Sequence, residues 1–293
     1  MEEHKNWKKK ELSVLLPVYE CECTDLVKSL HLQLEELGLP YEVIVADDGS
    51  ADKTHIEANR QIEKLSNVRY IVREENVGRS AIRNFLAQQA RYEWLLFIDG
   101  DVLVDRTRFI IKYLERSGDV IVGGYDLYMR NRGLVHNLRF LYETATTGHR
   151  QAHMSNSAKK PHLYTSNFII RRDIILEHPF NENITRYGYE DVLFGKTLCE
   201  AGHNIRFISN PVVLTSFEDN ESFVKKTEEA MQTLHDFKTE LDGYSAIPKL
   251  AFLRPVLKPL YGVFGKLIRR NLVGQNPHVS LLQLYRVLYY CSL

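Results

Sequence analysis

Short apolar runs alternate with helical patterns along the first hundred residues, and this alternation constrains the fold more than any other feature of the chain. Leu12–Val18 and Tyr41–Ala46 are buried-strand patterns, and the leucines between them recur at helical spacing. Val68–Val72 and Trp94–Ile98 are two further strand patterns, with a helical pattern from Gly78 to Arg91 between them. Repeated units of roughly 30 residues predict a parallel α/β sheet, whose ligands bind at the carboxyl ends of the strands.

The second half of the chain continues the mixture of strands and helices. We expect a mobile polar loop up to His162, because the residues before it are polar and include lysine and histidine. His149 and His153 stand four residues apart, but we assign them to this polar segment and not to a metal site. The other predicted elements are a strand at Asp119–Tyr125, a helix at Leu134–Thr147, a strand at Leu163–Arg171 and a helix at Glu190–Ala201.

Composition limits the classes of protein that the chain can represent. Its 293 residues are 44% hydrophobic and 26% charged, enough for one large domain or for one domain with an appendage. Lysine plus arginine equals aspartate plus glutamate at 38 each, which gives no reason to expect a nucleic-acid partner. Four cysteines without zinc-site spacing, and no apolar run of ~18 residues, predict a cytoplasmic protein with reduced thiols.

The C-terminal segment has its own charge pattern. No acidic residue follows Asp242, and a boundary near Asp242–Pro248 divides the chain into a main domain, 1–242, and a basic tail, 243–293. Apolar residues at helical spacing with cations between them fit an amphipathic segment on an anionic membrane. Packing on the main domain or on a second subunit fits equally, since Pro255 and Pro259 interrupt a long interfacial helix.

Two carboxylates follow one of the predicted strands. In Phe97-Ile98-Asp99-Gly100-Asp101, alternate residues at the strand end point the same way, so Asp99 and Asp101 can approach one ion. Hard carboxylate oxygens suit magnesium or manganese. A solvated turn is the competing interpretation, because aspartate and glycine are common in turns.

Two other strand ends carry polar segments. Asp47-Asp48-Gly49-Ser50 follows one strand, and Asn76-Val77-Gly78-Arg79-Ser80 begins the helix that contains Arg83. Each segment alone is explained by a turn, a helix cap or a solvated helix face. Together with the Asp-Gly-Asp segment they converge on one edge of a parallel sheet, which favours a ligand site there.

As a set, these segments resemble glycosyltransferase family 2, whose members have the GT-A fold. The resemblance rests on SVLLPVYE, VADDGSADKT, ENVGRSAIRN and FIDGD, spaced over residues 12–105 as in that family. It implies a Rossmann-like α/β domain with a mainly parallel sheet flanked by helices, to which the tail adds a C-terminal helical appendage. It also implies a nucleotide-sugar donor and a Mn²⁺ or Mg²⁺ cofactor.

The resemblance assigns donor-side roles residue by residue. Asp101 matches the acid that ligates the metal, and Asp99 matches the acid near the ribose or a metal-bound water. The remaining assignments are the lining of the nucleotide pocket by Pro17, Tyr19 and Glu20, a contact to the base by Asp48, and a contact to the nucleotide or diphosphate by Arg83.

A second acidic pair begins the last predicted helix. Glu190 and Asp191 favour capping of that helix, where the macrodipole stabilises negative charge. Sugar transfer also requires a base remote from the leaving diphosphate, and this pair supplies one. The segment YGYEDVLFGKTLCEAG resembles the acceptor motif of the family, which implies that Asp191 is the base and Glu190 an acceptor-binding group. The resemblance further assigns Ser166, Asn167 and Tyr189 to the sugar and the acceptor.

One departure concerns the metal. Many relatives carry a histidine after the last strand, whereas Pro211–Phe217 has none, so the ion binds more weakly or arrives with the nucleotide. The whole pattern predicts transfer of a hexose or N-acetylhexosamine, with inversion, from a UDP-sugar to a glycan or lipid-linked acceptor. This reaction would take place in the cytoplasm, at the inner face of a membrane if the tail binds there.

Two other functions fit parts of the same pattern. A sugar nucleotidyltransferase needs a glycine-rich loop with a basic residue after the first strand, where this chain has Pro17-Val18-Tyr19-Glu20. A non-catalytic, membrane-associated GT-A-like scaffold predicts a damaged acidic pair, and both pairs are intact.

Overall fold

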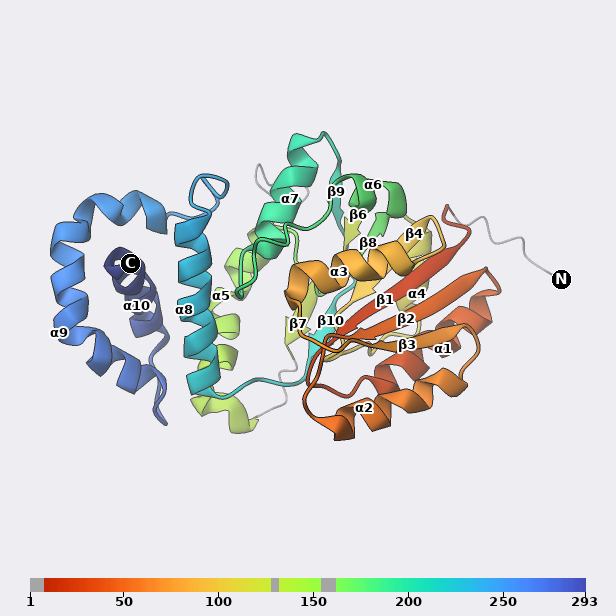
Figure 1. Cartoon of the computed structure of the whole chain (residues 1–293), viewed down its shortest axis with the longest axis horizontal. Coiled ribbons are helices and arrows are strands. Elements are labelled where there is room, and N and C mark those ends of the chain that lie inside the picture. The colour runs from red at the N-terminus through yellow and green to blue at the C-terminus, as the bar shows by residue number, and fades with distance from the viewer. Residues whose placement is uncertain (1–7, 128–131, 154–161) are drawn as a thin grey trace.

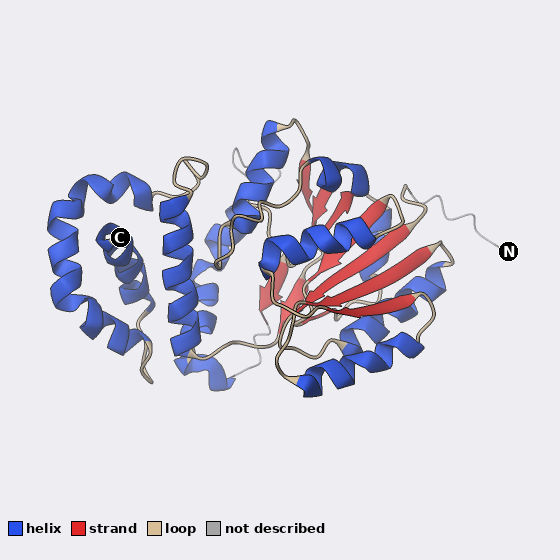
Figure 2. Ribbon diagram, in the orientation of Figure 1, coloured by secondary structure: helices blue, strands red, loops and turns tan. Residues whose placement is uncertain are grey.

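A seven-stranded, mostly parallel sheet forms the middle layer of the protein (Figures 1 and 2). This computed structural model describes residues 8–127, 132–153 and 162–293. The strands of the sheet are β1 (Leu12–Val18), β2 (Tyr41–Asp47), β3 (Val68–Val72), β4 (Trp94–Ile98), β6 (Val120–Val122), β8 (Asn167–Arg171) and β9 (Ile205–Phe207). Their order is β3-β2-β1-β4-β8-β6-β9, with β8 antiparallel to both of its neighbours and the other pairs parallel. A smaller sheet has the order β5 (Val102–Leu103), β10 (Val212–Leu214) and β7 (Tyr125–Leu127).

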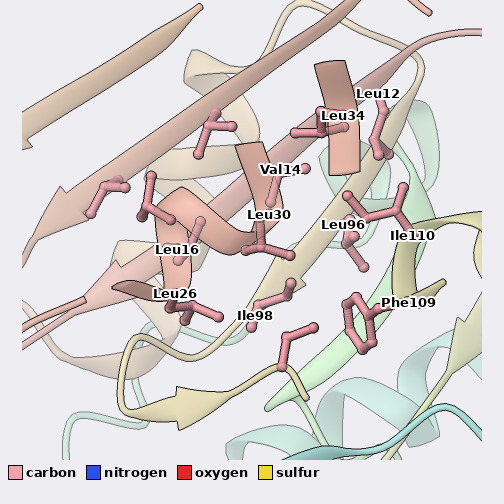
Figure 3. Close-up of a cluster of buried hydrophobic side chains, with 14 of the residues drawn as sticks. Leu12, Val14, Leu16, Leu26, Leu30, Leu34, Leu96, Ile98, Phe109 and Ile110 are labelled. Atoms are coloured by element: carbon pink, nitrogen blue, oxygen red, sulfur yellow. The ribbon is translucent and has the colours of Figure 1, made fainter. Parts of the chain in front are cut away.

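Helices cover both faces of the large sheet. The flanking helices are α1 (Thr24–Leu37), α2 (Lys53–Asn59), α3 (Gly78–Gln89), α4 (Phe109–Leu114), α6 (Arg172–Glu177) and α7 (Glu190–Glu200). Because side chains alternate along a strand, neighbouring residues of β1 face opposite layers: Val14 belongs to the core with α1 and α4, and Leu15 to the core with α3 and α6. Figure 3 shows the first of these two cores, in which Leu30 of α1 and Phe109 of α4 approach the strands.

The remaining helices pack beside the sheet and not on it. They are α5 (Leu138–His153), α8 (Asn220–Asp236), α9 (Arg254–Leu272) and α10 (Val279–Ser292), and 3₁₀ turns lie at Arg60–Lys64, Arg132–His136 and Ile247–Leu253. Apolar side chains of these four helices form a separate cluster in which Leu282 and Tyr285 are buried. Figure 1 shows α9 as the outermost element, curving around α10 at the end of the molecule opposite the N-terminus. None of the helices in the described ranges is long and apolar enough to cross a membrane.

The α/β fold with C-terminal helices is confirmed, and three local predictions are corrected. The strand predicted at Asp119–Tyr125 is divided into β6 and β7, because Gly124 turns the backbone with a φ of +73°. The strand predicted from Leu163 begins only at Asn167. Helix α5 starts after Asn137, whose side chain accepts the Phe140 N–H at 2.9 Å.

Helix α5 also occupies part of the segment that was expected to be a polar loop. It continues to position 153, so the backbones of both predicted loop histidines, 149 and 153, are helical. The rest of that predicted loop, 154–161, lies outside the described residues. The cysteines are free, as the sequence predicts. The domain boundary near Asp242 remains a prediction, since α8 precedes it and yet packs with α9 and α10.

Asn167, at the start of β8, joins three segments of the core. Its side chain is fully buried and accepts the Tyr113 hydroxyl at 2.6 Å. Its amide nitrogen donates to the carbonyls of Gly124 at 3.1 Å and Asn210 at 2.7 Å. A Cβ atom at Gly123 would overlap the Tyr113 hydroxyl, so only glycine fits at this position beside the Asn167 amide. The polar groups of this side chain are therefore consumed inside the fold.

This network yields a stability prediction. Asn167→Ala leaves the Tyr113 hydroxyl and two carbonyls buried without their partner, which costs on the order of 3 kcal/mol of unfolding free energy. Asn183→Ala, at an exposed position, is the control and is expected to change that free energy by less than ~0.5 kcal/mol. Urea unfolding followed by circular dichroism measures both, and equal effects of the two substitutions would contradict the role given to Asn167.

Candidate active site

The Asp-Gly-Asp segment is clamped between the ends of β1 and β8. The Asp99 N–H donates to the Ser166 carbonyl at 3.1 Å, and the Gly100 N–H donates to the Pro17 carbonyl at 3.2 Å. A Cβ atom at Gly100 would lie 2.7 Å from Val18 Cγ2, so a larger residue would push the ends of β1 and β4 apart. The glycine thus holds Asp99 and Asp101 at the carboxyl edge of the sheet.

Arg83 of α3 fixes the first of these carboxylates. Its side chain is 1% exposed, and Nη2 lies 2.5 Å from Asp99 Oδ1. Nη1 donates to the Arg79 carbonyl at 3.1 Å, while the buried Nε has no hydrogen-bond partner among the described residues. The charge-assisted pair orients Asp99 and leaves Arg83 enclosed, which makes Arg83 a positioning residue of the donor side.

Asp48 and Glu20 tie together the loops that follow the first three strands. The two carboxylate oxygens of Asp48 accept the N–H groups of Val77 at 3.1 Å and Gly78 at 3.0 Å. Burial raises the pKa of Asp48, and these two N–H groups partly offset the rise. Glu20 accepts the Ala51 N–H at 2.6 Å. The contacts of Asp48 and Glu20 with a nucleotide remain predictions, as do those of Pro17 and of Tyr19, which is 51% exposed.

The second acidic pair is positioned by a strained turn. Gly188 and Tyr189 both adopt left-handed backbone conformations, with φ of +96° and +67°. A Cβ atom at Gly188 would lie 2.8 Å from Ala230 Cβ of α8, so the turn fits only as glycine. Tyr189 itself packs into the cluster between α8 and α10. The turn therefore presents Glu190 and Asp191 at the N-terminus of α7.

Glu190 and Asp191 differ in their surroundings. Glu190 is 4% exposed, and its Oε2 atom has no hydrogen-bond partner within the described part of the chain. Asp191 Oδ1 accepts the N–H of the next residue, Val192, at 2.8 Å, but no side chain among the described residues caps α7, so only its acidic first turn fits the capping interpretation. Burial and then the charge of Glu190 raise the pKa of Asp191 to about 7, against smaller opposing effects of Arg79 and Arg83. Asp191 thus has the pKa of a general base that works near neutral pH.

Arg79, at the start of α3, lies between the two acidic pairs. Its Nη1 atom is 3.4 Å from Glu190 Oε1, and its guanidinium stacks over the Tyr187 ring at 5.2 Å. Desolvation opposes its charge, but Glu190, Tyr187, Asp99 and Asp101 together raise the pKa of Arg79. Both acidic pairs are therefore within electrostatic reach of one guanidinium.

A second arginine reaches the same region from α5. Arg139 forms an ion pair with Glu218, which also lies 3.1 Å from Lys226 Nζ. Asp101 is exposed at the surface, yet desolvation by the protein around it and then the charge of Asp99 raise its pKa, whereas Arg79 and Arg139 lower it. Arg139 was missed in the sequence, and Arg79 was named only as part of the segment that begins α3, without a role of its own. Ion pairs over long chain separations, such as that between Arg139 and Glu218, leave no local pattern.

The acidic residues of the sheet edge bear on whether a metal ion fits there. Within the described ranges, no cluster of three or more histidine, cysteine or acidic side chains could hold one. Asp99 and Asp101 nevertheless offer two hard carboxylates at one strand end. Mg²⁺ is commonly bound by one or two carboxylates together with substrate phosphates and water. The pair therefore fits an ion that completes its coordination with the diphosphate of a donor.

The predicted sugar-contacting residues are only partly compatible with that role. The backbone carbonyl of Ser166 accepts the Asp99 N–H, so Ser166 lies beside the acidic pair. Asn167 is enclosed in the core and its amide is fully used by Tyr113, Gly124 and Asn210. The prediction that Asn167 contacts the sugar is therefore wrong. Tyr189 acts in this structure through its backbone turn and its packing.

A sheet of this topology, with acidic residues and a helix start at its carboxyl edge, defines a GT-A glycosyltransferase. The chain belongs to glycosyl transferase family 2, whose family model matches residues 13–178. It is 28% identical over 207 residues to glycosyltransferase AglE of Haloferax volcanii, which covers 67% of this chain and 64% of that relative. It is 26% identical over 202 residues to a dolichyl-phosphate beta-glucosyltransferase of Dictyostelium discoideum, covering 65% of this chain and 50% of that relative.

Solved structures agree on the fold. The mannosyltransferase PcManGT from Pyrobaculum calidifontis, in complex with GDP-Man and Mn²⁺, aligns with a TM-score of 0.59 and 14% identity over 98% of this chain and 86% of that chain. Staphylococcus aureus TarS 1-349, in complex with UDP, aligns with a TM-score of 0.51 and 20% identity over 96% of this chain and 89% of that chain. At these identities the likeness shows the fold alone.

Proposed function

We propose that this glycosyltransferase moves a hexose or N-acetylhexosamine from a UDP-sugar to an acceptor hydroxyl, with a divalent metal and with inversion. One observation supports this most strongly: Arg79 lies 3.4 Å from Glu190, and Arg83, one turn further along α3, forms an ion pair with Asp99, so both acidic pairs flank the start of this helix. A transferase that inverts by one displacement needs such a pair of acidic groups, one for the leaving group and one for the nucleophile.

On the donor side, Asp99 and Asp101 would hold Mn²⁺ or Mg²⁺, which when bound neutralises charge on the leaving diphosphate. Arg83 keeps Asp99 in one orientation through their ion pair at 2.5 Å. Arg79 adds a positive charge within electrostatic reach of Asp101, which would oppose the negative charge that develops as the diphosphate departs. These residues therefore serve the bond that breaks.

On the acceptor side, Asp191 removes the proton of the acceptor hydroxyl. The oxygen then forms a bond to the anomeric carbon as the bond from that carbon to the diphosphate oxygen breaks, so the configuration inverts. The unpartnered Glu190 Oε2 is the atom that we assign to a hydrogen bond from a sugar hydroxyl, because buried carboxylate oxygens are rarely left without a donor.

The nucleotide of the donor and the identity of the acceptor are proposed from fewer observations. UDP is proposed from the fold neighbour TarS, solved with UDP, and GDP-mannose, present in PcManGT, is the competing donor for a binding screen. The chain spans 64% of the length of AglE and 50% of that of the Dictyostelium relative, so their activities are not transferred to it. A glycan or lipid-linked acceptor at the cytoplasmic face of a membrane is proposed from the basic tail.

The base assignment is tested with a matched pair of variants. Asp191→Asn should lower the rate of UDP-sugar turnover by roughly 10²–10⁴-fold, because the amide cannot take the proton. Asp173, in the first turn of α6, accepts the next N–H at 3.0 Å in the same manner and is the control for loss of that hydrogen bond. Asp173→Asn should leave the rate within about twofold. Equal losses in both variants would contradict the role of Asp191.

The pH profile gives the same test a second readout. With a pKa raised to about 7, Asp191 loses its charge as the pH falls, and only the charged form accepts a proton. We expect kcat/KM to fall about tenfold per pH unit below that pKa and to level off above it. A value of kcat/KM that stays constant down to pH ~5 would contradict a base whose pKa is raised in this way.

The metal assignment is tested by donor binding and not by turnover. Asp101→Asn should abolish the rise in melting temperature that UDP-sugar and Mn²⁺ produce together, because binding stabilises only the folded state. Asp105, four residues further and 54% exposed, is the matched control, and Asp105→Asn should retain the rise. Retention of the full rise in Asp101→Asn would refute metal binding at this segment.

A further inference from the structure

One face of α9 carries a row of exposed apolar side chains. Successive residues of a helix are ~100° apart, so positions 256, 260, 263, 264 and 267 lie on one side of the helix. Phe252, in the preceding 3₁₀ turn, is 74% exposed as well. The row, called here the α9 stripe, consists of Val256 at 61%, Leu260 at 39%, Val263 at 70%, Phe264 at 47% and Leu267 at 65% exposure.

The opposite face of α9 already holds the helix in place. Ile268 and Leu272 are buried in the cluster that contains Leu282 and Tyr285 of α10. The tail therefore packs on the rest of the chain through this buried face of α9, which was one of the alternatives for the tail. The α9 stripe contributes nothing to this core, and an apolar row of this length on a surface marks an interaction site.

The charges around the α9 stripe are all positive. Lys266 and Arg270 adjoin it on the helix, and neither forms an ion pair with any described residue. Arg269, one position away, instead turns inward and pairs with Glu221 and Glu228. Because no acidic residue follows Asp242, the cations beside the stripe are not neutralised by their own segment.

A groove adjoins the N-terminal end of the stripe. It has a volume of about 570 Å³ and is lined by the apolar surfaces of Phe252, Pro255 and Pro259. Arg254 and Lys258 line it too, so apolar walls stand next to two cations. This combination suits an amphiphilic anion, with its phosphate at the cations and its chain along the apolar walls.

We propose that the α9 stripe and this groove form a docking surface for an anionic phospholipid bilayer. The apolar side chains would enter the boundary between headgroups and acyl chains, while Lys266 and Arg270 would contact headgroup phosphates. The position of α9 at one extreme of the molecule leaves it free to meet a flat surface (Figure 1). This proposal rests on the proposed function in one respect only: if the protein transfers sugar, the docking surface would locate that reaction at a membrane.

A second copy of the chain is a poorer occupant of the same surface. In a symmetric dimer, identical patches face each other across the two-fold axis. The unpaired cations of the two stripes would then lie opposite one another, and like charges across an interface oppose association. An anionic bilayer covers the same apolar row and also neutralises those cations.

Vesicle flotation of the full chain tests the proposal. Vesicles of phosphatidylcholine mixed with phosphatidylglycerol should bind the protein, and vesicles of phosphatidylcholine alone should bind it much more weakly. Lys266→Glu combined with Leu267→Ser should weaken binding to the anionic vesicles by about tenfold or more. On α1, Lys28 is exposed and Leu32 is 65% exposed, so Lys28→Glu combined with Leu32→Ser is the matched control and should bind as the unmodified chain does.

The outcomes separate this proposal from the sugar-transfer proposal. Both double variants should have the melting temperature of the unmodified chain. In the absence of vesicles, both should also turn over UDP-sugar at the rate of the unmodified chain. Equal vesicle binding by the α9 variant and the control would overturn the docking surface, as would a dimer in light scattering that only the α9 variant dissociates. Absence of UDP-sugar turnover in the unmodified chain would contradict the proposed sugar transfer. It would not affect the proposal of a docking surface, which vesicle binding tests separately.

Discussion

The guanidinium of Arg79 is the charge on which the arrangement of the active site depends. Carboxylates gathered at one sheet edge repel each other, and burial adds to the cost of keeping them ionised. Arg79 counters this for both acidic pairs, since it lies 3.4 Å from Glu190 and is within electrostatic reach of Asp99 and Asp101. The Arg79 side chain is 47% exposed, so water screens these attractions, and they orient the carboxylates more than they stabilise the fold.

The scaffold brings this cation into place by backbone contacts. Asp48, after the end of β2, accepts the two N–H groups that precede Arg79, which fixes the start of α3. Gly100 allows β1 and β4 to end close together, and Gly188 allows the turn before α7 to pack against α8. Each of these three contacts joins segments distant in the sequence. The sheet edge thus acts as a rigid frame for groups that would otherwise separate.

Much of the frame could be predicted from the sequence, because buried strands are apolar runs bounded by polar turns. Val68–Val72 and Trp94–Ile98 were predicted with their observed ends, and the family resemblance is confirmed. The segment that contains Arg79 was predicted to lie at the site, but its contact with Glu190 could not be predicted, since the two residues are 111 positions apart. Asn167 was assigned to a sugar pocket because a polar residue at a strand end has the same local pattern whether it meets a ligand or, as here, the core.

The single displacement proposed for the two acidic pairs predicts inversion at the anomeric carbon. Asp101 and Asp191 are assigned to opposite sides of one anomeric carbon, so a donor with an α-linked sugar must give a β product. Proton NMR during slow hydrolysis of UDP-N-acetylglucosamine, with water as the acceptor, reports which anomer appears first. We predict that the β anomer is released first and then equilibrates. Initial release of the α anomer would contradict the single displacement and the opposed roles of the two acidic pairs.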